Sequence, residues 1–192
     1  MTTPAPPSPP GRPAAAVTIR ALDGADAEGF RTIRLAALLD TPSAFGASHH
    51  EEIGQPLAWF AARLAAPDSV MFGAFVDGAL AGIAGVVREP AAKERHRAAI
   101  RSMFVAPAYR GRGLAAALLA RALEAADAMP GVWQVVLTVT RGNTPAVRLY
   151  EAHGFTAYGV LPASLHVDGR YYDDVLMIRV RRDARAPAPG RP

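Results

Sequence analysis

The sequence contains no cysteine, and Lys93 is its only lysine. Without cysteine the chain can form no disulfide, no zinc–thiolate site and no thiol nucleophile. Its positive charge comes from arginines spread along the chain, which give a net charge of +4. Because basic binding faces usually show clustered Lys/Arg and a recognisable motif, we expect no nucleic-acid partner.

Long hydrophobic runs are also missing. No apolar stretch approaches the ~18 residues that a membrane-spanning helix needs. The opening MTTPAPPSPPGRPAAA has neither the charged start nor the apolar middle of a signal peptide. We therefore expect a cytoplasmic protein without a membrane partner.

Both ends of the chain have a biased composition rich in Pro and Ala. Residues 1–16 and 183–192 predict disordered tails, because such a composition cannot bury an apolar face. Residues 17–182 are expected to form one domain. A chain of 192 residues with 51% hydrophobic residues is long enough for one sizeable core and too short for two ordinary domains.

The order of periodic segments predicts a mixed α/β domain. Alternating or β-rich patterns favour strands over 17–22, 98–105, 132–140 and 169–180, and a hairpin within 69–89 that turns at Asp77-Gly78. Helical spacing favours helices over 25–40, 56–64, 114–129 and 143–155. The helix over 114–129 lies between two strands, which implies a parallel pair there and helices on both faces of the sheet.

The stretch YRGRGLA, residues 109–115, leads into the helix over 114–129. Gly111 and Gly113 would let an anion approach the unpaired amides at the helix start, where the helix dipole also favours negative charge. Arg110 and Arg112 add charge that can pair with phosphate. A glycine pair alone more often marks a plain turn, so the loop by itself leaves both interpretations open.

Two nucleotide-binding classes are disfavoured by the same stretch. The chain has no G-x-x-x-x-G-K-S/T, the P-loop pattern. Ala116 stands where the six-residue dinucleotide fingerprint needs its third glycine. We therefore expect a ligand other than ATP or NAD at this loop.

Two segments resemble motifs of the GCN5-related N-acetyltransferase (GNAT) superfamily. VAPAYRGRGLA, residues 105–115, resembles the family pattern V-x-P-x-Y/W-R/Q-x-x-G-x-G/A, and NTPAVRLYEAHGF, residues 143–155, resembles N-x-x-A-x-x-L/F-Y-x-x-x-G-F. Both occur in the family's order, with a strand between them. The resemblance implies the GNAT fold, a mixed, mostly antiparallel sheet of six to seven strands. Helices would cover both faces, and a splayed V would separate the two central parallel strands.

The resemblance also implies acetyl-CoA as cofactor and direct attack by a primary amine in a ternary complex. In the family, pantetheine lies in the V along the strand before the loop, and the loop backbone holds the pyrophosphate. The matching positions here are Met103, Phe104 and Val105 on the strand; Arg110, Gly111, Arg112, Gly113, Leu114 and Ala115 in the loop; and Asn143, Ala146 and Tyr150 in the second motif. The Val105 N–H would stabilise the oxyanion.

Tyr150 matches the family tyrosine whose hydroxyl reaches the thioester sulfur, so the resemblance implies that it is the general acid. Its helical face is shared with Ala146, Leu149 and His153, which also fits a core position. Asn143 can cap its helix, contact the cofactor, or do both.

The general base is left open by the sequence. The strand before the loop reads AAIRSMF, without the carboxylate that some family members place there. Glu51 and Glu52 follow the first helix, in a segment that often borders the acceptor pocket in the family, and Glu51 is the candidate base and acceptor-binding residue. Solvated charges at a helix start fit both positions equally well.

The remaining acceptor-pocket candidates are aromatic. They are Phe45 and the pair Tyr171 and Tyr172, which open a YYDD run. Strand alternation sends Tyr171 and Asp173 to one face and Tyr172 and Asp174 to the other, so either pair could hold a cationic amine; packing at a hairpin edge is the alternative. No metal is expected, because the neighbouring residues of HHEE cannot easily converge on one ion.

These features predict an enzyme that acetylates a small-molecule amine. A protein amine as acceptor and a non-catalytic acyl-CoA-binding or sensing module both stay open. A homodimer is also open, since dimers are frequent in the family.

Overall fold

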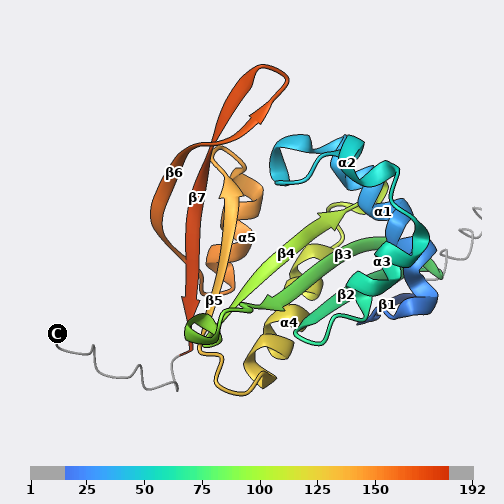
Figure 1. Cartoon of the computed structure of the whole chain (residues 1–192), viewed down its shortest axis with the longest axis horizontal. Helices are drawn as coiled ribbons and strands as arrows, with labels where there is room; N and C mark the ends of the chain where they lie inside the picture. Colours follow the sequence, from blue (N-terminus) through green and yellow to red (C-terminus); the bar gives the residue numbers. More distant parts are fainter. Residues whose placement is uncertain (1–15, 182–192) are drawn as a thin grey trace, which may run out of the picture.

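The structure is a computed structural model that describes residues 16–181. The two predicted tails, apart from Ala16, lie outside the described residues, and the domain limits stay a prediction. Within residues 16–181 seven strands form one sheet in the order β1-β2-β3-β4-β5-β7-β6 (Figure 1). The strands are β1 (Val17–Ala21), β2 (Ser69–Val76), β3 (Ala79–Arg88), β4 (Arg97–Val105), β5 (Gln134–Thr140), β6 (Thr156–Val167) and β7 (Arg170–Val180).

Helices cover both faces of this sheet, as predicted. They are α1 (Ala27–Asp40), α2 (His49–Ile53), α3 (Leu57–Leu64), α4 (Leu114–Ala128) and α5 (Thr144–Ala152), with short 3-10 turns η1 (Gly24–Asp26), η2 (Pro42–Ala44), η3 (Ala92–Glu94) and η4 (Pro107–Tyr109). No helix within residues 16–181 is both long and apolar enough to cross a membrane.

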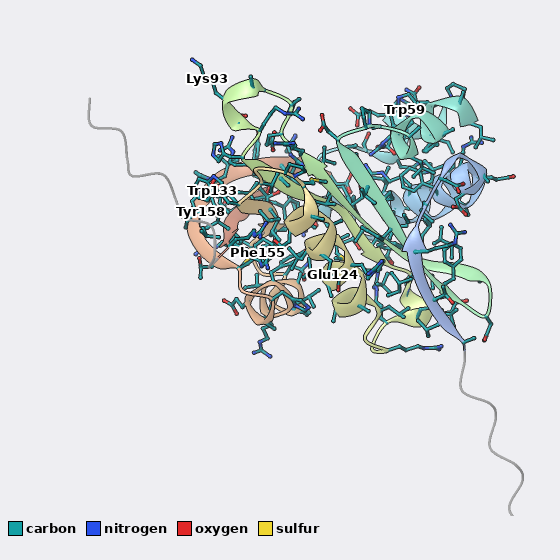
Figure 2. The ribbon with its side chains drawn as sticks, turned by 90° about the horizontal axis from the view of Figure 1, so that it is seen from below. Trp59, Lys93, Glu124, Trp133, Phe155 and Tyr158 are labelled. Carbon is teal, nitrogen blue, oxygen red and sulfur yellow. The ribbon has the colours of Figure 1, made fainter. Side chains whose placement is uncertain are left out.

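Two hydrophobic cores lie on opposite sides of the sheet. On one face α4 buries Leu114, Leu118 and Ala122 against residues such as Phe72. On the other face α1 and α3 bury a second cluster that includes Phe30, Phe60, Met71 and Phe104. Figure 2 shows side chains packed on both sides of the ribbon, with Lys93 on a loop that projects from the body. The alternation of β2, β3 and β4 thus supplies side chains to both cores.

β4 and β5 diverge along their length. They pair in parallel only at Arg97↔Gln134, Ala98↔Val135 and Ala99↔Val136. Beyond this point β4 continues alone beside β3, and β5 continues beside β7. Ser102 in β4 has a left-handed φ of 55°, and the β3–β4 register shifts between Ile83 and Gly85. This β-bulge bends β4 away from β5 and confirms the predicted splayed V.

The sequence patterns placed most elements and missed one strand. β6 (Thr156–Val167) was not among the predicted strands, because it is an edge strand that pairs only with β7 and most of its side chains are exposed. Its register is also interrupted, between Ala157 and Gly159 and between Leu161 and Leu165. An edge strand exposed on both faces has no apolar alternation to read.

Candidate active site

One pocket opens beside the N-terminus of α4, and we name it the α4-side pocket. Its volume is 590 Å³. It brings together every predicted cofactor residue except Arg112. These residues are Met103, Phe104, Val105, Arg110, Gly111, Gly113, Leu114, Ala115, Asn143, Ala146 and Tyr150.

The two glycines of the loop are required by backbone conformation. Gly111 and Gly113 have φ values of 75° and 77°, which favour glycine. A Cβ added to either residue would meet no protein atom within 4 Å, so the space beside the loop is open.

Gly113 is the N-cap of α4 and no side chain caps this end. The Ala117 N–H donates to the Gly113 carbonyl at 3.1 Å. The amides of residues 114–116 precede this bond and lack helical partners, so this helix start is suited to an anion.

Arg110 and Arg112 make contacts within the protein. The Arg110 Nε donates to the Val105 carbonyl at 2.9 Å, and its Nη2 pairs with Asp40 at the end of α1. The hydrogen bond from Arg110 lowers the pKa of Asp40. The Arg112 Nη2 donates to the Ala108 carbonyl at 3.1 Å. Arg110 therefore ties the loop to β4 and α1, and phosphate contacts of both side chains stay a prediction.

The backbone of β4 offers a donor to the V. The Ala106 N–H, just after β4, donates to the carbonyl of Ala81 in β3 at 2.9 Å. Because amides alternate sides along a strand, the Val105 N–H points away from β3 and into the V. This direction suits the predicted oxyanion donor.

A second pocket lies on the other face of the sheet, and we name it the α1-side pocket. Its volume is 540 Å³, and its walls come from α1, α3, the segment 44–47 and strands β2 to β5. The two pockets adjoin, because both are lined by Ala44, Phe45, Met103, Asn143, Ala146 and Tyr150. The V therefore joins two cavities that open from opposite faces of the sheet.

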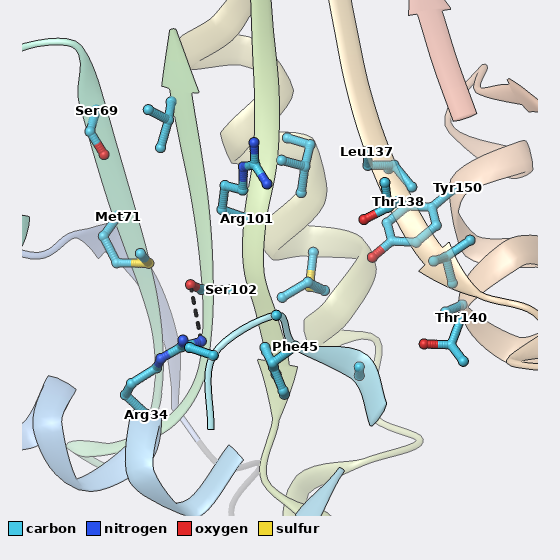
Figure 3. Close-up of a pocket in the computed structure, with 18 of the residues that line it drawn as sticks. Arg34, Phe45, Ser69, Met71, Arg101, Ser102, Leu137, Thr138, Thr140 and Tyr150 are labelled. Atoms are coloured by element: carbon cyan, nitrogen blue, oxygen red, sulfur yellow. Dashed lines mark hydrogen bonds between the residues drawn. The ribbon is translucent and has the colours of Figure 1, made fainter. Parts of the chain in front are cut away.

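Tyr150 lies at this junction. Its ring is buried and packs edge-on against Phe155, with centroids 5.9 Å apart. Figure 3 shows its hydroxyl pointing into the α1-side pocket from the α5 side. No residue within 16–181 makes a hydrogen bond with that hydroxyl. Burial raises the pKa of Tyr150 to about 12, so the hydroxyl keeps its proton at neutral pH.

Asn143 also lines both pockets. Its Oδ1 accepts a hydrogen bond from the Ala146 N–H at 3.3 Å, which confirms the predicted helix cap. Gly154 follows α5 with a φ of 85°, a left-handed conformation that ends the helix. The second motif thus builds the helix that presents Tyr150 to the V.

A buried ion cluster supports the α1-side pocket. Arg34 donates from Nε and Nη2 to the two carboxylate oxygens of Glu52, at 2.9 and 2.7 Å. Arg63 reaches the same carboxylate at 3.3 Å. Burial favours a raised pKa for Glu52, but the bonds and charges of the two arginines outweigh burial and hold that pKa below its ordinary value. The Phe45 ring lies 5.1 Å from the Arg34 guanidinium carbon.

Glu51, the candidate base, lies away from both pockets. Its carboxylate forms a capping box with Ser48, accepting from the Ser48 backbone N–H at 2.6 Å and the Ser48 hydroxyl at 2.9 Å. These bonds lower the pKa of Glu51. Glu51 lines neither pocket, so the geometry gives it a helix-capping role.

The YYDD run does not reach either pocket. Tyr171 is exposed and stacks on His166, with ring centroids 4.5 Å apart. Asp173 accepts from the Ala163 N–H at 3.0 Å and pairs with Arg141, while the buried Asp174 accepts from the Ser164 hydroxyl at 2.7 Å. Tyr172 also lines neither pocket. Of the predicted acceptor residues, only Phe45 is brought to the V.

Sequence reasoning missed the arginines of the α1-side pocket. Arg34 falls four residues after Phe30 and next to Ile33, within the buried stripe of α1. A charged residue inside an apolar helical stripe needs a buried partner, so the position of Arg34 in the sequence could have indicated a buried ion pair. Ser102, which also lines this pocket, gave no such signal, because its position depends on the bulge in β4.

Neither pocket supplies an obvious proton acceptor. No Asp, Glu or His is among the residues, all within 16–181, that line the two cavities. No group of three or more His, Asp or Glu in that part of the chain could hold a metal ion. The ionisable side chains that line the cavities are arginines and tyrosines.

A sheet that splits between two parallel strands, beside a glycine-rich helix start, is the arrangement that the resemblance to N-acetyltransferases implied. The chain belongs to the acetyltransferase (GNAT) family, whose model matches residues 31–155. The seven-stranded mixed sheet with helices on both faces is the GNAT fold.

Relatives with curated names support this assignment. The chain is 33% identical over 117 residues to phosphinothricin N-acetyltransferase of Streptomyces viridochromogenes, covering 61% of this chain and 62% of that protein. It is 36% identical over 78 residues to spermidine N(1)-acetyltransferase of Vibrio cholerae, covering 41% of this chain and 45% of that protein. The matches thus span about half the length of these curated relatives.

Solved structures show the same fold. yncA of Salmonella typhimurium, determined with its cofactor acetyl-CoA, is 25% identical, with a TM-score of 0.75, and the match covers 91% of this chain and 99% of that one. A GNAT-family acetyltransferase of Streptococcus pneumoniae is 24% identical, with a TM-score of 0.75, and the match covers 86% of this chain and 99% of that one.

Proposed function

We propose that the protein transfers the acetyl group of acetyl-CoA to the primary amine of a small molecule. One observation carries this proposal: two pockets from opposite faces of the sheet meet in the V, with Tyr150 at their junction. Membership of the GNAT family, the acetyl-CoA in yncA and the amine substrates in the relatives' names support it.

The α4-side pocket fits acetyl-CoA. The open space beside Gly111 and Gly113, with the free amides at the start of α4, suits a pyrophosphate. The V-facing backbone of Val105 suits the amide groups of pantetheine. Acetyl-CoA, when bound, supplies an activated thioester carbonyl.

Two groups of this chain would serve the transfer. The Val105 N–H would donate to the carbonyl oxygen as that oxygen gains negative charge. The Tyr150 hydroxyl would donate its proton to the departing sulfur, and its raised pKa keeps that proton in place until then. Because no carboxylate or imidazole lines the pockets, the amine would lose its proton to solvent before the attack.

The same lack of a base favours one second candidate, a module that binds acyl-CoA without turnover. The two functions separate in one experiment. Purified protein is given acetyl-CoA and a panel of amines, release of the CoA thiol is followed, and acetyl-CoA binding is measured by calorimetry. We expect binding and amine-dependent thiol release. Binding without release from any amine would favour the second candidate, and lack of binding would refute both.

Three finer expectations stay predictions. They are the cytoplasmic location, the homodimer and the choice of a small molecule over a protein amine. Gel filtration with light scattering measures the second, and a peptide arm in the amine panel tests the third.

A further inference from the structure

The α1-side pocket carries positive charge that acetyl transfer does not itself require. Three arginines line it, Arg34 from α1, Arg63 from α3 and Arg101 from β4. No carboxylate is among the residues that line this pocket. A cavity that receives an amine would ordinarily be expected to attract a cation, and this one has cationic walls instead.

Nearby carboxylates do not cancel this charge. Glu52 is buried and only 4% exposed, and its single negative charge is shared by Arg34 and Arg63. Arg101 has Glu89 as its nearest paired carboxylate, at 3.9 Å, and its side chain is 60% exposed. Burial, and then the neighbouring charge of Arg34, lower the pKa of Arg63, as expected for a cation beside another cation. The walls therefore present net positive charge to the cavity.

The buried Arg34 also has one N–H group, Nη1, that makes only a weak hydrogen bond within the protein. Arg34 uses Nε and Nη2 on Glu52, whereas its Nη1 makes only a long contact of 3.5 Å with the Ser102 hydroxyl. Figure 3 shows this end of Arg34 and Ser102 together at one side of the pocket, with Arg101 nearby and the Tyr150 hydroxyl on the other side. Ser102 is held in this position by the bulge of β4. Because Arg34 is held by Glu52 and covered by Phe45, its Nη1 donor is preorganised.

We propose that the acceptor amine carries an oxyanion, of which the carboxylate of an α-amino acid is the simplest case. Arg34 Nη1, the Ser102 hydroxyl and Arg101 bind this oxyanion and present the amine to Tyr150 across the pocket. Phe45, Met71 and Leu137 also line the cavity and give the rest of the acceptor an apolar surface. The inference rests on the proposed function, and it disfavours polyamines, which would meet like charge.

The same charges serve the chemistry. Cations near an amine disfavour its ammonium form and lower its pKa. An acceptor anchored by its oxyanion would thus have its amine held close to the arginines, where the neutral and reactive form is favoured. This effect replaces part of what a general base would do in a pocket that has none.

The test compares acceptors that differ only in the oxyanion. The pairs are L-leucine with isoamylamine and L-phenylalanine with phenethylamine, and spermidine serves as the polycation. Each is assayed for thiol release with acetyl-CoA, and for binding to the CoA-loaded protein by calorimetry. The protein variants are Arg101→Gln and, as matched control, Arg121→Gln. Arg121 is a half-exposed arginine of α4 that pairs with Glu124 and lines neither pocket.

We expect kcat/KM to be about 10- to 100-fold higher for the amino acid of each pair, from hydrogen bonds to a charged group. Arg101→Gln should reduce this ratio several-fold and Arg121→Gln should leave it unchanged. Equal or better use of the amines without a carboxylate, or of spermidine, would overturn the inference while leaving the proposed function intact. A ratio that Arg101→Gln does not change would overturn the role of Arg101. If no acceptor is turned over, tighter binding of the amino acids still supports the inference, and equal or absent binding refutes it.

Discussion

Replacing Tyr150 by phenylalanine removes one hydroxyl from the junction of the two pockets and leaves the ring in place. Within residues 16–181 that hydroxyl has no hydrogen-bond partner, so its loss removes no internal bond. Deleting a buried hydroxyl without a partner costs little stability, because the desolvation of the group is removed with it. The thermal midpoint of Tyr150→Phe should therefore stay within a few degrees of the wild type.

The effect on rate should be much larger. A positioned general acid contributes roughly 100- to 10,000-fold to a rate. Since the leaving thiolate is a fairly stable anion, we take the lower end, a fall in kcat of about 100-fold, or about 2.7 kcal/mol of transition-state stabilisation. Acetyl-CoA affinity should change less than about twofold, because the backbone of the loop and of β4 provides the proposed cofactor contacts.

The assay is thiol release at saturating acetyl-CoA and acceptor, with acetyl-CoA affinity measured separately by calorimetry. Tyr158→Phe is the matched control, since Tyr158 is an exposed tyrosine of β6 outside both pockets. A kcat of Tyr150→Phe within about threefold of wild type would refute the acid role and leave Tyr150 as a core residue. A loss of acetyl-CoA affinity as large as the loss of rate would instead give Tyr150 a cofactor-positioning role.

Two further predictions concern proton transfer and the loop. The kcat/KM should rise with pH as the acceptor amine loses its proton and then stay level. The level region follows because burial raises the pKa of Tyr150 to about 12, so its hydroxyl remains protonated. A fall in kcat/KM below about pH 10 in a pH–rate profile would contradict this reasoning. Gly113→Ala should weaken acetyl-CoA binding about 5- to 30-fold, because the free loop can relax from φ 77° and returning an alanine to it on binding costs about 1–2 kcal/mol. Gly54→Ala is the control in calorimetry, because Gly54 has a φ of −80° and a Cβ added there also meets no atom within 4 Å. Equal affinity of the two variants for acetyl-CoA would remove the loop from the cofactor site.

Local patterns predicted most of the fold because they report local physics. Asp77 and Gly78 both have positive φ, as the predicted hairpin turn requires, and the stripe Leu114, Leu118, Ala122 and Leu123 is buried under α4. The V was predicted only through the resemblance, since nothing in the spacing of β4 and β5 shows that they part after three pairs.

The acceptor side was predicted less well, for a physical reason. The carboxylates at 51 and 52 are neighbours, and helix α2 turns Glu52 inward to the arginines while Glu51 closes its own helix start. Which of two adjacent glutamates is buried depends on where Arg34 and Arg63 lie in three dimensions, and sequence spacing carries no such information. The place of the YYDD run outside both pockets likewise depends on pairing with β6, the strand that was missed, and the acceptor role of its tyrosines stays a prediction.

Helix α1, one body of 14 residues, contacts wall residues of both pockets. Arg34 in its middle lines the α1-side pocket, and Asp40 at its end pairs with Arg110 of the glycine loop. A shift of this helix is therefore common to both cavities. By thermodynamic linkage, any factor by which a bound acceptor tightens acetyl-CoA through α1 must equal the factor by which acetyl-CoA tightens the acceptor. The order in which the two ligands bind then alters the route to the ternary complex and leaves its free energy unchanged.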